Sequence, residues 1–212
     1  MKPDKNDLKK KLAAYCTLSA GFLAMHAEKA CAQIIYTDVN PDAVLNSSFW
    51  LGANYQLDLN NDGIVDFRLS ENFSSWSTYY MSTAFSAYLN SSNRIDGYGN
   101  NKMMASSLGN FPKPLSIGDT INANNIVLSN GILEHRFSSQ EYHQGFPTVN
   151  NSFYSEQGLF DLYAEKYVGL KLLMGGNTYY GWARIKILWG EMIVYDYAVN
   201  PTPNQQILAG QQ

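Results

Sequence analysis

One short segment of the chain carries oxygen ligands at the spacing of a calcium-binding loop. It reads Asp58-Leu59-Asn60-Asn61-Asp62-Gly63-Ile64-Val65-Asp66, with oxygen-bearing side chains at positions one, three, five and nine and glycine at position six. Calcium takes six to eight oxygen ligands at about 2.3–2.6 Å, and this alternation lets a tightly wound loop point them inward. We therefore predict a structural calcium site whose ligands are Asp58, Asn60, Asp62, the backbone carbonyl of Ile64, and Asp66.

The flanks of this segment distinguish it from an EF-hand. An EF-hand needs a bidentate glutamate at position twelve, where this chain has Leu69, and helical flanks instead of the strand-like alternation found here. The loop resembles the calcium loops of β-proteins with Asp-x-Asn-x-Asp-Gly-x-x-Asp repeats, as in integrin-type propeller blades and thrombospondin type 3 segments, although one copy is present here. The alternative is an Asn-Asp-Gly turn that binds nothing, because these residues are also common turn formers.

Side chains that support catalysis are few. After residue 32 the histidines are His135 and His143, eight residues apart in a segment that we predict to be a loop without defined geometry. Glu191 and Asp196 flank the last predicted strand, but their spacing puts them on opposite faces and roughly 17 Å apart. Glycosidase carboxylates lie about 5–9.5 Å apart. We predict no catalytic residues, and a carbohydrate-active enzyme with carboxylates from separate strands is the least favoured alternative.

Aromatic residues are concentrated in a serine-rich stretch, residues 73–98. They are Trp76, Tyr79, Tyr80, Phe85, Tyr88 and Tyr98. Exposed aromatic rings among polar residues can stack on sugar rings or contact a partner protein. The alternative is that these rings form core and cross-strand pairs.

The elements that must position these residues are predicted to be β-strands. Short alternating runs rich in β-branched and aromatic residues are separated by Gly, Asn, Asp and Ser. The predicted strands are residues 33–37, 53–59, 64–70, 126–128, 166–174, 178–188 and 192–199, with two more within 73–89. Residues 90–125 are predicted to be long connections. We expect one antiparallel β-sandwich of the jelly-roll type over residues 33–212.

The C-terminal strands form a predicted antiparallel meander with tight turns at residues 175–177 and 189–191. One face of its middle strand is predicted to be core and carries Ala183, Ile185 and Ile187. Trp182 lies on the other face, where we expect the aliphatic stems of Arg184 and Lys186 to shield it.

Residues 1–32 have the features of a cleavable signal peptide. A lysine-rich start precedes an apolar run over residues 12–25, which is too short to span a bilayer of about 30 Å. Ala30-Cys31-Ala32 then supplies the small residues that signal peptidase requires. We predict cleavage before Gln33 and a secreted protein, extracellular or periplasmic, with no later membrane span.

Removal of residues 1–32 would change both the cysteine content and the charge. Cys16 and Cys31 both lie there, which excludes a disulfide framework and a cysteine-ligated zinc site in the remainder. Six of the 15 basic residues and three of the 18 acidic ones also lie there, which leaves a net charge of −6. An acidic chain without basic runs is unsuited to nucleic acid.

Three pieces of the sequence resemble a large group of secreted bacterial proteins common in Bacteroidetes-type genomes. They are Ala32-Gln33-Ile34-Ile35-Tyr36-Thr37-Asp38-Val39-Asn40-Pro41-Asp42, the Asp58–Phe67 loop, and the C-terminal Tyr180-Gly181-Trp182-Ala183-Arg184, Asp196-Tyr197-Ala198 and Ile207-Leu208-Ala209-Gly210 motifs. The resemblance implies export and a β-fold and implies no particular activity.

We therefore predict a secreted, non-enzymatic β-sandwich with a structural calcium loop that acts in cell-surface or extracellular interaction, with a glycan or a surface protein as partner. The alternative is a glycan-binding module that uses the aromatic residues of 73–98.

Overall fold

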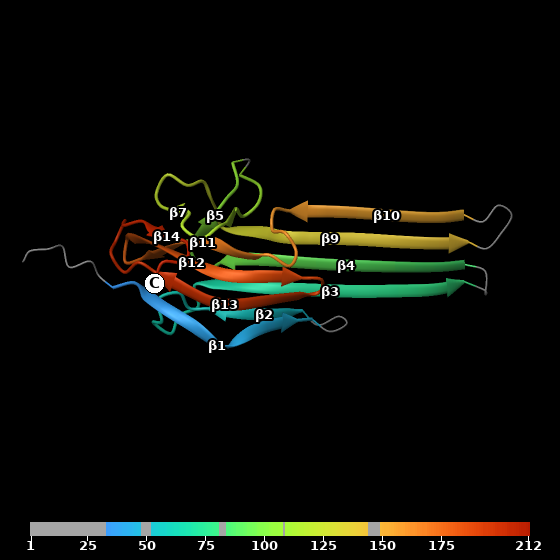
Figure 1. Ribbon diagram of the computed structural model, residues 1–212, viewed down its shortest axis with the longest axis horizontal. Helices are drawn as coiled ribbons and strands as arrows, with labels where there is room; N and C mark the ends of the chain where they lie inside the picture. Colours follow the sequence, from blue (N-terminus) through green and yellow to red (C-terminus); the bar gives the residue numbers. More distant parts are fainter. Residues whose placement is uncertain (1–32, 48–51, 81–83, 108, 144–148) are drawn as a thin grey trace, which may run out of the picture. The chain divides into compact units, whose positions relative to one another are not determined.

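Two antiparallel sheets hold almost all of the regular structure in the computed structural model of the chain (Figure 1). The structure describes residues 33–212 apart from 48–51, 81–83, 108 and 144–148, so the predicted signal peptide lies outside the described residues. These residues belong to one unit, Gln33–Gln212, and include no helix long and apolar enough to cross a membrane. The predicted all-β, antiparallel fold is confirmed.

The strands divide into two larger sheets and one small one. The first sheet has the order β1 (Ile35–Asn46), β13 (Glu191–Val199), β12 (Asn177–Leu188), β11 (Glu165–Met174), β5 (Lys102–Met104) and β8 (Val127–Leu128), with β6 (Pro114–Leu115) also paired to β11. The second sheet has the order β10 (Val149–Gly158), β9 (Asn130–His143), β4 (Ala84–Gly97), β3 (Phe67–Tyr80) and β2 (Ala53–Leu57). A small sheet pairs β14 (Ile207–Leu208) with β7 (Thr120–Ile121).

Consecutive strands mostly stay within one sheet. β2, β3 and β4 follow one another in the second sheet, β9 and β10 form a hairpin beside them, and β11, β12 and β13 form the predicted meander in the first. This order of hairpins differs from the two Greek keys of the expected jelly roll. Glycines at the tight turns explain the hairpins; Gly175 and Gly176, for example, have φ values of 58° and 80° between β11 and β12.

The two sheets enclose one hydrophobic core. The second sheet and its loop contribute the buried side chains of Leu57, Leu59, Phe67, Leu69, Ile95 and Leu133. The first sheet contributes those of Val168, Leu170, Leu172, Ala183, Ile185, Ile187, Met192, Val194 and Val199. The predicted core face of the middle meander strand is therefore confirmed.

A second, smaller core forms around Trp182 on the other face of the first sheet. Trp182 is only 1 % exposed and packs with Met104, Leu115 and Ile207, while its indole nitrogen donates a 3.1 Å hydrogen bond to the Gln211 carbonyl. Loops and the C-terminal segment thus shield Trp182, and the prediction that basic stems would do so is wrong. The guanidinium of Arg184 instead binds the Asp196 carboxylate through two hydrogen bonds of 2.8 and 2.9 Å.

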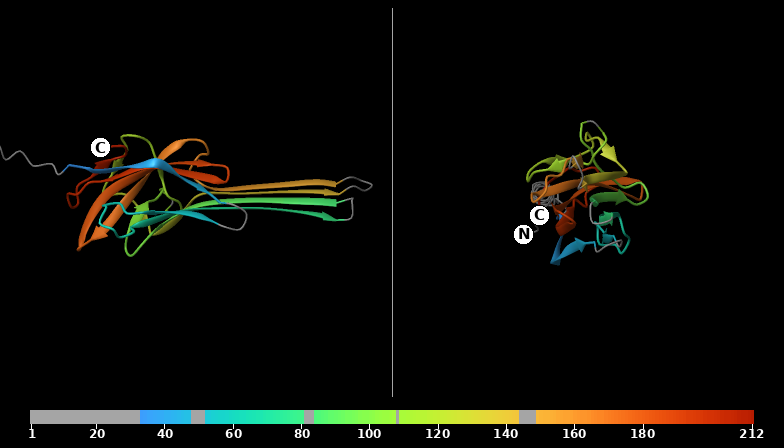
Figure 2. Two further views of the ribbon diagram at one scale, coloured as in Figure 1. Left: turned by 90° about the horizontal axis from the view of Figure 1, so that it is seen from below. Right: turned by 90° about the vertical axis from the view of Figure 1, so that its right-hand side faces the viewer.

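Four strands of the second sheet continue past the sandwich as a structure that we call the arm (Figure 2). The arm comprises residues 73–80 of β3, 84–91 of β4, 136–143 of β9 and 149–156 of β10, which pair rung by rung without a register shift. Along β3, β4 and β9, the last buried hydrophobic residues before the arm are Leu69, Ile95 and Leu133. At the base of the arm, Phe73 lies against Gly190 in the turn between β12 and β13. Beyond this contact no described strand of the first sheet pairs with the arm or lies over either of its faces (Figure 2).

Most strands of the arm were not predicted from the sequence. The two strands expected within residues 73–89 are present as parts of β3 and β4, but β4 continues into the predicted connection at 90–97, and β9 and β10 were assigned no strand. A strand that faces solvent on both sides lacks the apolar alternation by which strands are recognised. Serine- and asparagine-rich runs such as Asn90-Ser91-Ser92-Asn93 therefore read as loops.

A buried polar row crosses the second sheet where the arm begins. Glu71, Asn93 and Glu134 are direct neighbours on β3, β4 and β9, and all three are buried. The backbone nitrogen of Ser47 donates to the Glu71 carboxylate at 3.0 Å, and the Asn93 amide donates to Glu134 at 3.0 Å. Glu134 also forms an ion pair with Arg136, with 2.6 Å between Oε1 and Nε. Burial raises the pKa of both Glu71 and Glu134.

The raised pKa of Glu71 predicts how stability depends on pH. Between the ordinary carboxyl pKa of about 4.3 and the raised pKa of Glu71, the folded state binds more protons than the unfolded state. The free energy of unfolding should therefore decrease as the pH rises from about 4.3 through the pKa of Glu71 in the folded protein. Glu71→Gln removes the ionisable group, so we expect it to raise the free energy of unfolding at pH 7 by on the order of 1 kcal/mol. Urea denaturation between pH 4.5 and 8 measures the difference.

Asp161→Asn, which removes an exposed carboxylate in the turn after β10, is the control and should leave the pH dependence unchanged. A Glu71→Gln variant that is less stable than the unmodified protein at pH 7 would show that the charged carboxylate is favourable there.

Candidate functional site

The predicted calcium loop connects β2 to β3 and is organised by its own carboxylates. Asp58 accepts hydrogen bonds from the backbone nitrogens of Asp62 at 3.1 Å and Gly63 at 2.6 Å. Asp62 accepts from the nitrogen of Ile64 at 2.8 Å and from the amide of Asn60 at 2.9 Å. Gly63 has a φ of 87°, a value that residues with a side chain rarely adopt. Asp58, Asn60 and Asp62 are thus gathered into one tight turn.

Asp66 joins the two ends of the loop through a hydrogen bond and is buried. It is 5 % exposed, and its carboxylate accepts a 2.8 Å hydrogen bond from the nitrogen of Leu59 and a 3.2 Å one from the amide of Asn101. Burial raises the pKa of Asp66, and the nearby carboxylates of Asp62 and Asp58 raise it further, while the Leu59 and Asn101 hydrogen bonds oppose this. The loop therefore concentrates negative charge that a cation would offset.

The loop offers oxygen ligands of the kind that calcium binds, but its carboxylates do not converge on one point. A hollow of about 240 Å³ borders the loop and is lined in part by Asn60, Asp62, Asp66 and Asn101, all oxygen donors of the kind that calcium prefers. Among the described residues, however, no three His, Cys, Asp or Glu side chains lie close enough together to hold a metal ion. The calcium site therefore stays a prediction, with Ile64 contributing a backbone carbonyl.

The histidines and carboxylates considered for catalysis are dispersed. His135 and His143 lie on β9, so the prediction of a loop there is wrong, and eight residues of strand separate them by roughly 27 Å at about 3.4 Å per residue. Asp196 is held by Arg184, and the Glu191 carboxylate accepts a 3.4 Å hydrogen bond from Asn46. These side chains form no common site.

The arm carries a continuous row of four aromatic rings on one face, which we call the aromatic row. It comprises Trp76 on β3, Tyr88 on β4, Phe137 on β9 and Phe153 on β10. Successive ring centroids are 5.3, 6.3 and 6.0 Å apart, within the range of favourable aromatic contacts. The row reaches both edges of the arm, where Trp76 is 53 % and Phe153 is 59 % exposed.

Polar side chains flank every ring of the row. Residues two apart on a strand share a face, so each ring has a serine or asparagine beside it. These neighbours are Ser74, Asn90, Ser139 and Ser155. Trp76 and Tyr88 stack on one another at an interplanar angle of 17°, so the freest ring surfaces are those of the two outer residues.

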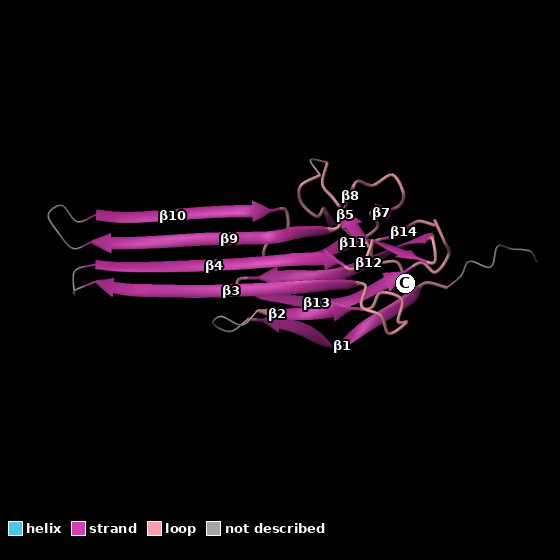
Figure 3. Cartoon of the chain, turned by 180° about the vertical axis from the view of Figure 1, so that it is seen from behind, coloured by secondary structure: helices cyan, strands magenta, loops and turns pink. Residues whose placement is uncertain are grey.

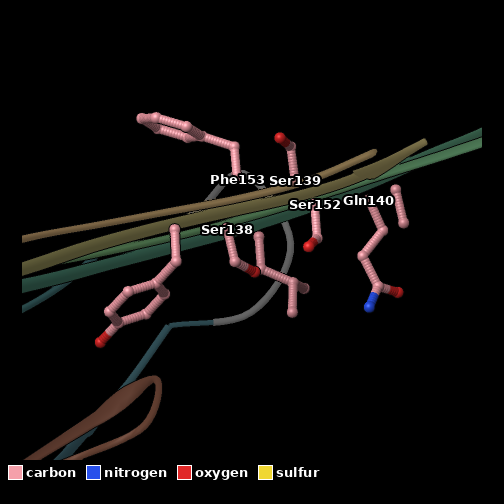
Figure 4. A pocket seen from close by; sticks show the side chains of 8 residues that line it. Ser138, Ser139, Gln140, Ser152 and Phe153 are labelled. Carbon is pink, nitrogen blue, oxygen red and sulfur yellow. The ribbon is translucent and has the colours of Figure 1, made fainter. Parts of the chain in front are cut away.

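The opposite face of the arm has a hollow of about 360 Å³ between β4, β9 and β10. Figure 4 shows Ser138, Ser152 and Gln140 on the side of the ribbon opposite to Phe153 and Ser139. Tyr154 also lines this hollow, and its hydroxyl donates a 2.9 Å hydrogen bond to Glu156. Both faces of the arm therefore combine aromatic rings with hydroxyl and amide groups.

Sequence reasoning identified one half of the aromatic row. Trp76 and Tyr88 were among the predicted candidates, whereas Tyr98 lies beyond the arm, after the end of β4. The side chains of Tyr79, Tyr80 and Phe85 lie outside the description. Phe137 and Phe153 were missed, although serine surrounds both of them as it does the aromatic residues of 73–89. This shared serine-rich composition could have identified Phe137 and Phe153 as members of the same surface.

Comparison of the chain with known protein families, with curated proteins and with solved structures finds no match. The site must therefore be interpreted from its own geometry.

The calcium prediction is tested by thermal denaturation with calcium and with a chelator. Calcium bound only to the folded state at 100 times its Kd would add about 2.7 kcal/mol. For a domain of this size that is a rise in Tm of roughly 5–10 °C. Asp62→Asn keeps an oxygen that can accept the Ile64 hydrogen bond but removes the charge, so we expect it to lose the calcium-dependent rise.

Asp119→Asn is the matched control, because Asp119 also organises a turn by accepting a backbone hydrogen bond, from Ser116 at 2.9 Å. It should keep the calcium response. Identical melting curves with calcium and with chelator would leave residues 58–66 as a turn that binds no ion.

Proposed function

We propose that this chain is an exported, non-enzymatic binding protein that engages extracellular ligands through its arm. The observation that carries the proposal is the aromatic row, which extends from edge to edge of a sheet whose two faces are both accessible. The strands of the arm lie outside the sandwich, so their aromatic side chains are not needed to fill the core between the two sheets. Exposed aromatic surface on such strands is characteristic of an interaction site.

A glycan is the ligand class that best fits the chemistry of the row. Sugar rings present apolar C–H faces and a rim of hydroxyl groups, and aromatic rings with polar neighbours match both features. The open ring surfaces of Trp76 and Phe153 provide two stacking positions at opposite edges of the arm. Ser74, Asn90, Ser139 and Ser155 supply hydroxyl and amide groups on the same face.

The charges on the arm favour an uncharged glycan. Arg136 is its one arginine, and ion pairs with Glu134 and Glu156 engage it. On the face of the aromatic row, the Glu141 carboxylate accepts a hydrogen bond from the Tyr88 hydroxyl. Since no cationic side chain of the described arm is available for an acidic sugar, stacking and neutral hydrogen bonds dominate recognition.

The calcium loop and the signal peptide have supporting roles in this proposal. A calcium ion held by Asp58, Asn60, Asp62, Asp66 and the Ile64 carbonyl would stabilise the connection between β2 and β3 without contacting the ligand. The features of residues 1–32 and the absence of cysteine from residue 33 onward support export to the periplasm or the cell exterior.

Binding to polysaccharides tests the proposal. In affinity electrophoresis against neutral polysaccharides such as xylan, mannan and β-glucan, the protein should be retarded by at least one of them. Trp76→Ala and Phe153→Ala should each weaken that binding about fivefold or more, as expected when truncation of a contacting aromatic side chain costs more than about 1 kcal/mol.

Tyr98→Ala and Tyr163→Ala, which remove exposed aromatic rings outside the arm, are matched controls and should bind normally. Equal retardation of all four variants would place the ligand elsewhere, and no retardation of the unmodified protein by any polysaccharide would contradict a glycan ligand.

A further inference from the structure

Strand β10 forms an exposed edge of the arm (Figure 3). One side of the strand pairs with β9 over all ten residues without a register shift, and no described strand pairs with the other side. Its sequence, Val-Asn-Asn-Ser-Phe-Tyr-Ser-Glu-Gln-Gly, contains neither proline nor lysine. Proline, lysine and bulges are the features that usually prevent an edge strand from pairing with another chain. β10 has none of them.

The single charge on β10 is already engaged. Glu156 accepts a hydrogen bond from Arg136 on the neighbouring strand and a second, 2.9 Å, from the hydroxyl of Tyr154. The edge therefore presents no free charge that would repel an identical edge. It does present exposed aromatic rings on both faces of the sheet, since Phe153 and Tyr154 are 59 % and 54 % exposed.

We propose that β10 pairs with β10 of a second copy of this chain, antiparallel and about a two-fold axis that lies midway between the two Phe153 residues. Directly opposed residues of an antiparallel ladder lie on the same face, so a two-fold axis perpendicular to the sheet must place one residue opposite its own copy. Phe153 lies at the middle of the strand. Residues 149–157 of the two copies then pair along their full length, and Glu156 faces Asn150 instead of another carboxylate.

The proposed pairing also extends the aromatic row. A two-fold axis perpendicular to the sheet keeps each face on the same side, so the two Phe153 rings meet across the interface. The rows of both copies then form one line of eight rings on an eight-stranded sheet. The antiparallel arrangement places the two sandwiches at opposite ends of this sheet.

The other edge of the arm, on β3, is the competing partner. Pairing of β10 with β3 of the next copy would also be antiparallel, but it leaves free edges at both ends and produces open-ended polymers. A two-fold pair uses the same strand twice and closes. This inference concerns self-association alone and stands without the proposed glycan binding.

Analytical ultracentrifugation of the purified protein without polysaccharide tests the proposal. We expect a concentration-dependent dimer. Phe153→Lys and Tyr154→Lys, which add charge to the edge, should each weaken dimerisation at least tenfold. Ser77→Lys, a matched change at an exposed position on the β3 edge, should leave it intact. Circular dichroism and melting curves confirm that each variant is folded.

A protein that stays monomeric up to 200 μM overturns the proposal. So does assembly beyond the dimer that Ser77→Lys abolishes, since that result indicates pairing between β10 and β3.

Single cysteines then test the register, in a background in which Cys16 and Cys31 are replaced by serine. Phe153→Cys places two thiols directly opposite, with Cα atoms about 4.5–5.5 Å apart, which suits a disulfide. Tyr154→Cys opposes residue 152 and should cross-link poorly, and Trp76→Cys on β3 should not cross-link. Efficient cross-linking of Tyr154→Cys instead of Phe153→Cys contradicts the register in which the two Phe153 residues oppose one another.

Discussion

The structure depends on where the contact between the two sheets ends. Up to Leu69, Ile95 and Leu133, the second sheet is held by burial of apolar side chains against the first. Beyond the buried polar row the same strands have no opposing sheet and rely on backbone hydrogen bonds and cross-strand side-chain pairs. A sheet of four strands without an opposing layer gains stability when it continues into a packed structure. The arm therefore depends on the sandwich for its stability, and the arm carries the candidate binding surface.

The aromatic row has a structural role, and in the proposed function it also has a binding role. Contacts between Trp76, Tyr88, Phe137 and Phe153 tie four neighbouring strands together on one face, as cross-strand pairs do in other sheets. The inner two rings are half-buried by these contacts, while the outer two keep open surface. Stability and recognition thus draw on the same side chains, which is why each aromatic variant must be checked for folding as well as for binding.

The sequence predicted the parts of the fold whose two faces differ. Strands β11, β12 and β13 alternate between core and another environment, so Ala183, Ile185 and Ile187 could be assigned to the core correctly. The arm lies in water on both faces and has no such alternation, so β9 and β10 were missed together with Phe137 and Phe153. Trp182 was misassigned for another reason: the segment that covers it, around Ile207 and Gln211, is distant in sequence and carries no local signal. The turn at residues 58–66 could be anticipated from its Asn, Asp and Gly residues, because its geometry is encoded within nine residues, whereas calcium binding there stays a prediction.

The buried polar row divides the second sheet into parts of unequal local stability. Glu71, Asn93 and Glu134 replace apolar contacts with buried polar groups at the point where the core ends, so opening the sheet there costs less than opening it at Leu69 or Ile95. The arm can therefore unfold as a cooperative unit while the sandwich remains folded. Amide hydrogens of residues 73–80 and 136–143 would exchange with solvent through this partial opening, whereas those of β12 would exchange only when the whole protein unfolds.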